Sequence, residues 1–337
     1  MDHARRTDVY HRRSAGPHLN RHWSFTPCTA AAHPAHTTPR QRARARRADA
    51  GVSDPVELRI STPLGERTAL QWGAVGAPVV LALHGWLDNA ASFARLAPRL
   101  ATAHRVIAID FPGHGHSAHL PAGVRRYHFV DQVDTVLDCA DALGLGRFDL
   151  AGHSLGAGVA SLVAAAVPQR VRRLALIEGL GPLADDGTQT LARWRDAAAQ
   201  RVRDHRTPRV FTTIDAAVAA RVAAGGLTAD EARPIVVRNL REVGTGFVWG
   251  SDPRLRLTTP LRVEEAQVRR LLAGITAPAL LLLADPATPY LPSAQMELRA
   301  ACVAGIRVEH LAGPHHLHIR HPDTVARVLQ EFLQRAR

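Results

Sequence analysis

The feature that most constrains the fold of this chain is the alternation of short apolar runs with helix-like segments over residues 56–177. Residues 79–83 read Val-Val-Leu-Ala-Leu and residues 105–109 read Arg-Val-Ile-Ala-Ile, which is the length and character of strands buried on both faces. Such alternation predicts a doubly wound, mostly parallel α/β sheet. The expected strands are residues 56–60, 69–72, 79–83, 105–109, 147–151, 173–177, 279–283 and 308–311.

The alternation is interrupted after residue 179. Residues 180–277 are rich in arginine and alanine and carry mainly helical patterns, and strand character returns at residue 279. Ligands of open α/β sheets bind beyond the carboxyl ends of the strands, where an insertion of this kind can cover them. We therefore expect a core of residues 52–179 and 278–337 with a helical lid of residues 180–277.

The first 51 residues differ from the rest in composition. The chain has a net charge of +12 and all its basic residues are arginine, and residues 1–50 hold 10 arginines and 3 aspartates with few aliphatic side chains. Such a segment buries too little apolar surface to offset its ordering entropy, so residues 1–51 are expected to be a disordered tail. Weak polyanion binding and an organelle transit peptide remain alternatives. The absence of lysine indicates a GC-rich genome, in which we expect translation to begin at Val52.

Several classes of protein are excluded by composition. No apolar run approaches the roughly 18–20 residues of a membrane-spanning helix, and the N-terminus has no signal-peptide core. The cysteines, Cys28, Cys139 and Cys302, are too few and too far apart for a disulfide scaffold. We expect a cytoplasmic protein without a membrane or specific nucleic-acid partner.

The sharpest chemical signal is residues 152–156, which read Gly-His-Ser-Leu-Gly between an expected strand and an expected helix. A G-x-S-x-G sequence in that context forms a tight turn that exposes the serine hydroxyl near the amino end of the helix. The two glycines leave room where strand and helix approach each other. The pattern predicts that Ser154 is a catalytic nucleophile.

Four motifs together resemble the α/β-hydrolase superfamily: residues 84–86 (His-Gly-Trp), 110–117 (Asp-Phe-Pro-Gly-His-Gly-His-Ser), 152–156 and 313–315 (Gly-Pro-His). Residues 84–93 and 177–182 look like the corresponding segments of the serine hydrolase-like proteins of that superfamily. The resemblance runs from about residue 56 to the end of the chain. It implies a serine hydrolase that cleaves a small carboxylic ester or related acyl bond and needs no cofactor, but it does not identify the substrate.

The resemblance also implies the partners of the nucleophile. The general base lies in a loop before the last helix, which favours His315, seven residues before Pro322, with His316 as the alternative. An acid must hold the tautomer of this histidine. Both Glu178, at the end of the sixth strand, and Asp285, after the following strand, meet the required order, so the acid stays open between them.

The oxyanion hole implied by the resemblance uses the backbone N–H groups of Leu155 and Trp86. The substrate pocket is expected to include His84, Gly85, Trp86 and His153. In the lid, the aromatic side chains Trp194, Phe211, Phe247 and Trp249 are expected to shape it further.

Two other interpretations remain. A hydrolase fold without hydrolysis would act as a binding module, and a C–C bond or lactone hydrolase would use the same fold and serine. A metal site among His114, His116 and His119 is not expected, because no aspartate accompanies these histidines and the segment matches a structural turn of the superfamily.

Overall fold

The computed structural model describes residues 54–200 and 208–335. The expectations for the tail of residues 1–51 and for a start at Val52 lie outside these ranges. Within the described residues, no helix is both long enough and apolar enough to cross a bilayer.

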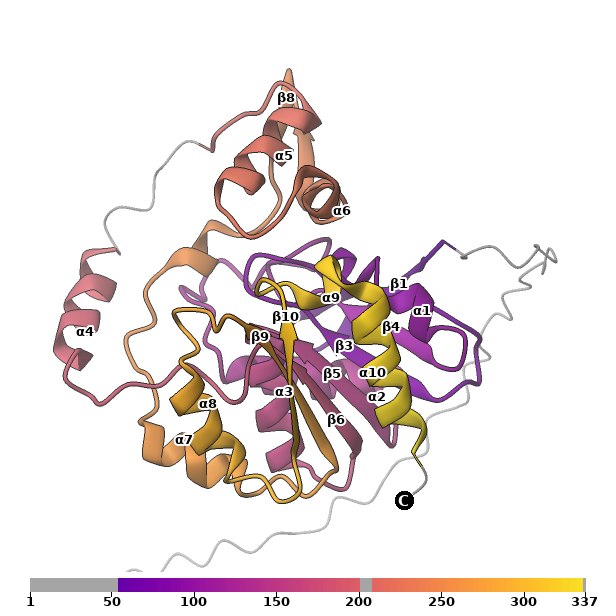
Figure 1. The fold of residues 1–337 in the computed structure, drawn as a ribbon. Coiled ribbons are helices and arrows are strands. Elements are labelled where there is room, and N and C mark those ends of the chain that lie inside the picture. The colour runs from indigo at the N-terminus through magenta and orange to yellow at the C-terminus, as the bar shows by residue number, and fades with distance from the viewer. Residues whose placement is uncertain (1–53, 201–207, 336–337) are drawn as a thin grey trace, which may run out of the picture. The chain divides into compact units, whose positions relative to one another are not determined.

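A twisted eight-stranded sheet forms the centre of the described part of the chain (Figure 1). Its strands follow the order β1-β2-β4-β3-β5-β6-β9-β10, and all pairs from β4 to β10 are parallel, whereas β2 pairs antiparallel with β1 and β4. The α/β fold class predicted from the alternation is confirmed. The strands are β1 (Val56–Thr62), β2 (Gly65–Trp72), β3 (Val79–Leu83), β4 (Arg105–Ile109), β5 (Phe148–His153), β6 (Val171–Ile177), β9 (Ala279–Asp285) and β10 (Arg307–Ala312).

Helices cover both faces of the sheet, which is why its central strands are apolar throughout. One apolar cluster joins the sheet to α2 (Asp131–Ala142), α3 (Leu155–Ala166), α7 (Glu265–Leu272) and α8 (Ser293–Ala300). A second cluster, on the opposite face, joins it to η1 (Ala90–Phe93), α1 (Ala97–Leu100), α9 (Leu317–Arg320) and α10 (Pro322–Gln334).

The inserted segment is not purely helical. It contains the expected helices α4 (Thr190–Ala199), α5 (Ile214–Ala223) and α6 (Ala229–Asn239), a short η2 (Pro253–Arg256), and also an antiparallel hairpin of β7 (Leu240–Val243) and β8 (Gly246–Trp249). The hairpin follows from local chemistry, because Gly244 provides a positive φ in the turn and β8 is rich in β-formers. Helix α7 also departs from the lid interpretation, since Val268 and Leu272 pack into the main core.

Helices α5 and α6 lie beyond the carboxyl ends of the strands and have a small apolar cluster of their own (Figure 1). They are fastened to the core mainly through α6. The Asn89 side-chain amide donates to the carbonyl of Ile235 at 2.8 Å, and Arg320 forms an ion pair with Glu231.

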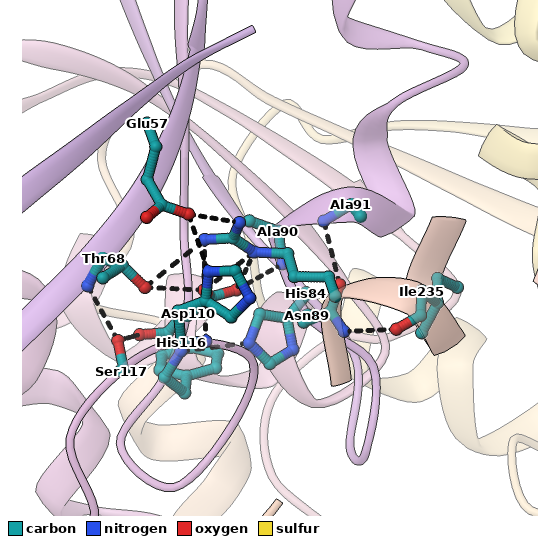
Figure 2. Close-up of polar contacts among 12 residues, drawn as sticks. Glu57, Thr68, His84, Asn89, Ala90, Ala91, Asp110, His116, Ser117 and Ile235 are labelled. Atoms are coloured by element: carbon teal, nitrogen blue, oxygen red, sulfur yellow. Dashed lines mark hydrogen bonds and ion pairs between the residues drawn. The ribbon is translucent and has the colours of Figure 1, made fainter. Parts of the chain in front are cut away.

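A third connection is the ion pair of Arg238 on α6 with Asp110 after β4, in which both side chains are buried. Arg238 Nη2 donates to Asp110 Oδ2 at 2.6 Å, and its Nη1 donates to Glu57 at 2.7 Å. Asp110 also accepts from Thr68 Oγ1 and from the backbone N–H groups of Ala90 and His116 (Figure 2). Burial raises the pKa of Asp110, but the Arg238 charge and these donors outweigh burial and leave the pKa below its ordinary value.

We predict that Arg238→Met lowers the free energy of unfolding by roughly 3–5 kcal/mol, because it leaves a buried carboxylate without its cation. Urea unfolding followed by circular dichroism measures the change. The matched control is Arg233→Met on the same helix, where the ion pair with Asp215 is exposed and is worth at most about 1 kcal/mol. Equal losses for the two variants would contradict the prediction.

Candidate active site

Ser154 occupies the sharp turn between β5 and α3. Its backbone has φ +52° and ψ −114°, a region that non-glycine residues rarely adopt and that marks local strain. A Cβ at Gly152 would lie 2.4 Å from the Gly156 carbonyl oxygen, and a Cβ at Gly156 would lie 2.1 Å from that of Leu83. The two glycines are therefore required sterically, as the motif predicts, and the turn has the geometry of a nucleophile elbow.

The imidazole of His315, in the loop after β10, pairs with the carboxylate of Glu178. His315 Nδ1 donates to Glu178 Oε2 at 2.9 Å, and the backbone N–H of Ala284 donates to Oε1 at 2.5 Å. Glu178 follows the last residue of β6, has φ +54°, and is 2% exposed. With Nδ1–H held by the carboxylate, the other ring nitrogen of His315 is left as the proton acceptor.

Asp285, the other candidate acid, lies at the end of β9 with its side chain exposed. Its backbone carbonyl accepts from Gly313 N–H at 3.1 Å, while its carboxylate forms no hydrogen bond or ion pair with any described residue. Of the two carboxylates that the sequence left open, the structure brings only Glu178 to His315.

The nucleophile, acid and base candidates converge at one edge of the sheet. Ser154 N–H donates to the Ile177 carbonyl at 2.9 Å, so the serine lies beside the strand end that leads into Glu178. His153 Nε2 donates to the backbone carbonyl of His315 at 3.1 Å. This bond brings the loop between β10 and α9, here called the histidine loop, to the elbow. Ser154 Oγ has no hydrogen bond to any described residue; nucleophile–base contacts of this kind often form fully only with substrate.

The expected oxyanion donors lie on the two turns that flank this edge. Leu155 is the first residue of α3, where backbone N–H groups have no partner within the helix. Trp86 lies in the turn after β3, with an exposed indole whose Nε1 donates to the Leu255 carbonyl of η2 at 3.2 Å. The buried ring of His84 holds the turn after β3 in place. Phe111 N–H donates to His84 Nε2 at 3.0 Å, and His84 Nδ1 donates to the carbonyl of Gly85 at 2.7 Å.

The residues expected to line the substrate pocket differ in exposure: the two histidines are buried and Trp86 is exposed. His84 is 0% exposed and His153 is 1% exposed, so these rings order the turns and present no surface to a substrate. Gly85 is needed because a Cβ there would lie 2.9 Å from His153 Nδ1. Trp86 is the expected pocket residue with substantial exposure.

The aromatic side chains of the insertion also separate into two groups. Phe211 is buried in the apolar cluster of the α5–α6 unit, and Trp249 meets it edge to face at a centroid distance of 5.1 Å. Trp249 and Phe247 are half-buried against this cluster. Trp194 on α4 is exposed. Of the four aromatic side chains expected to shape the pocket, Phe211 is therefore buried inside the insertion, and for Phe247, Trp249 and Trp194 the expectation stays a prediction.

Three residues beside the site were not singled out as functional by sequence reasoning. The ring of Tyr290 meets His315 edge to face at 5.1 Å. Asp88 is buried and its Oδ2 lies 3.1 Å from His316 Nε2, while Arg221 of α5 approaches its Oδ1 at 3.3 Å. The sequence offers one signal for Asp88, since it closely follows a strand expected to be buried, where a carboxylate needs polar partners.

Comparison with known proteins agrees with this architecture. A family model described as alpha/beta hydrolase fold matches residues 78–223. A serine hydrolase-like protein of Danio rerio is 32% identical over 288 residues, covering 82% of this chain and 88% of that protein. A hypothetical protein of Pseudomonas aeruginosa PAO1 superposes with a TM-score of 0.77 at 38% identity, covering 84% of this chain and 99% of that one. The chain therefore belongs to the α/β-hydrolase superfamily, within which its relatives are serine hydrolase-like proteins, and these relationships support a hydrolase.

Buried histidines near the site predict how stability depends on pH. Burial, together with the charge of the neighbouring His84, lowers the pKa of His114 from its ordinary value of about 6.5 to about 3. The unfolded chain therefore binds a proton as pH falls below about 6.5 and the folded chain does not until about pH 3, so stability is lost over that interval.

We predict that His114→Gln removes roughly 2–3 kcal/mol of the stability difference between pH 7.5 and pH 4.5. Urea unfolding at the two pH values measures it. His310→Gln, at an exposed position on β10, serves as the control and should leave the difference unchanged. An unchanged pH dependence in His114→Gln would show that this histidine is protonated in the folded state.

Proposed function

We propose that the protein is a serine hydrolase that cleaves a small carboxylic ester or a related acyl bond through an acyl-enzyme. The observation that carries the proposal is the buried Glu178–His315 pair at 2.9 Å beside a serine with positive φ in an elbow turn. Nucleophile, base and orienting acid on neighbouring turns are the arrangement that activates a serine hydroxyl.

The proposed mechanism assigns one role to each residue. His315 takes the proton of Ser154 Oγ as the oxygen attacks the carbonyl carbon, and later returns it to the leaving group. Glu178 holds the Nδ1–H tautomer and stabilises the imidazolium. The N–H groups of Leu155 and Trp86 stabilise the oxyanion, and each such donor contributes about 10²–10³-fold in rate. Water then releases the acyl group by the same steps, and no cofactor takes part.

The insertion would provide the walls of the substrate site. Trp86 is exposed and is tied to η2 through Leu255, so this indole is our candidate for contact with a small-molecule substrate. A catalytically weak binding module is the second candidate function, since Ser154 Oγ is not hydrogen-bonded to His315 in this structure.

The nucleophile is tested with a fluorophosphonate probe, which reacts only with an activated serine. We expect labelling of the wild type and none of Ser154→Ala, with turnover of short p-nitrophenyl esters falling about 10³–10⁶-fold in the variant. Absence of both labelling and turnover in the wild type would contradict the hydrolase and favour the binding module. Labelling without ester turnover would instead favour a C–C bond or lactone hydrolase.

The acid is tested by comparing Glu178→Gln with Asp285→Asn. We expect Glu178→Gln to lower kcat about 10²–10⁴-fold with little change in KM, because the amide stabilises the wrong tautomer of His315. Asp285→Asn is the matched control, since its carboxylate is exposed, and should change kcat less than about twofold. A larger loss in Asp285→Asn would assign the acid to Asp285.

A further inference from the structure

A second group of titratable side chains lies behind the candidate triad. Asp88, His153 and His316 come from the turn after β3, the end of β5 and the loop before α9, and all three are buried, with 3%, 1% and 8% exposure. One atom from each lies within 4.8 Å of the other two. Neither the fold nor the proposed reaction requires three such groups to meet in the interior, where isolated polar groups are costly.

The proton on His153 can be located from geometry. Its Nε2 lies 3.1 Å from the carbonyl oxygen of His315, and a carbonyl can only accept, so Nε2 carries a hydrogen. Its Nδ1 is buried and has no hydrogen-bond partner among the described residues. A hydrogen on Nδ1 would have no acceptor within reach, so Nδ1 presents a bare lone pair to the interior.

That lone pair faces another acceptor. The nearest carboxylate oxygen, Asp88 Oδ2, lies 3.9 Å from His153 Nδ1. Asp88 Oδ2 also accepts a hydrogen bond from His316 Nε2 at 3.1 Å, and the other nitrogen of His316 has no partner among the described residues. The lone pair of His153 Nδ1 therefore has no donor, and it lies in a buried space beside the hydrogen-bonded pair of Asp88 and His316. A cation that displaces the proton of that hydrogen bond would satisfy all three side chains at once.

The surroundings match those of a metal ligand set. Tetrahedral bonds of 2.0–2.1 Å place ligand atoms roughly 3.4 Å apart, and the 3.1 and 3.9 Å separations bracket that value. Ligating histidines usually donate their second N–H to a carbonyl, as His153 does to His315. Ligating carboxylates are usually hydrogen-bonded on the remaining oxygen, as Asp88 Oδ1 is by Arg221 at 3.3 Å.

We propose that Asp88, His153 and His316 bind one divalent cation with the ligand preferences of zinc. Three protein ligands of the N, N, O type with a fourth position for water are a common zinc arrangement. The ion would link the residue before Ser154 to the residue after His315, and so would hold the elbow and the histidine loop together. Its role is to position the two turns; it does not take part in bond cleavage.

This site goes beyond the sequence expectation that no metal is bound. The three ligands are separated by 65 and 163 residues in the chain and form no spacing motif. This group does not include the three histidines that lie close together in the sequence, His114, His116 and His119.

The test is the metal content of the full-length protein, purified with a tag that lacks histidine, exposed to Zn²⁺ and dialysed. Elemental analysis by mass spectrometry should find about one zinc ion per wild-type chain, in addition to the nonspecific zinc that the other histidines bind in every variant. In His316→Gln and in Asp88→Asn the zinc should fall to that nonspecific level. His310→Gln, the exposed control, should keep the wild-type content. Equal zinc in wild type and both variants, or no zinc in the wild type, would overturn the proposal.

A second measurement uses the wild type alone, because a variant that fails to fold would also lose zinc. Removal of the ion with a chelator should lower the thermal midpoint, and added Zn²⁺ should restore it, since a ligand that binds only the folded chain stabilises it. An unchanged midpoint would overturn the proposal. Ser154→Ala should bind zinc like the wild type, so failure of the metal site and failure of the proposed hydrolase activity are distinguishable.

Discussion

The site depends first on the parallel pairing of β5 with β6. Parallel strands end at the same edge of a sheet, so the turns that follow them are neighbours. The bond from Ser154 N–H to the Ile177 carbonyl continues this pairing one step beyond β5 and brings the elbow to the residue before Glu178. On its other side Glu178 is held by β9, whose Leu282 carbonyl accepts its N–H. The candidate acid is thus positioned by backbone bonds on both sides.

A buried carboxylate then joins this edge to the insertion. Asp110 bonds to β2 through Thr68, to the turn after β3 through Ala90, and to α6 through Arg238. Arg221 of α5 likewise pairs with a core carboxylate, that of Asp88, whereas Arg193 and Arg254 pair with aspartates of the insertion itself. The charges of Arg238 and Arg221 are thus used within the fold, where they hold the insertion against the core.

Most of the fold could be predicted because its signals are local. Five- to seven-residue apolar runs and the helical period between them depend only on neighbouring residues, and the predicted strands agree with the observed ones to within a few residues. The hairpin of β7 and β8 was missed because its strands are four residues long, too short for a period to show. The packing of α7 against the core was missed because an amphipathic pattern does not say which apolar surface a helix will meet.

For the candidate site, the sequence by itself predicted the elbow at Ser154, because the five-residue motif and the strand and helix expected around it are local signals. It could not decide between Glu178 and Asp285. Which of the two carboxylates lies beside His315 depends on the sheet order and on the backbone at the ends of β6 and β9, and in the structure it is Glu178. The grouping of Asp88 with His153 and His316 is likewise a product of the tertiary structure, because it joins atoms that no local pattern relates.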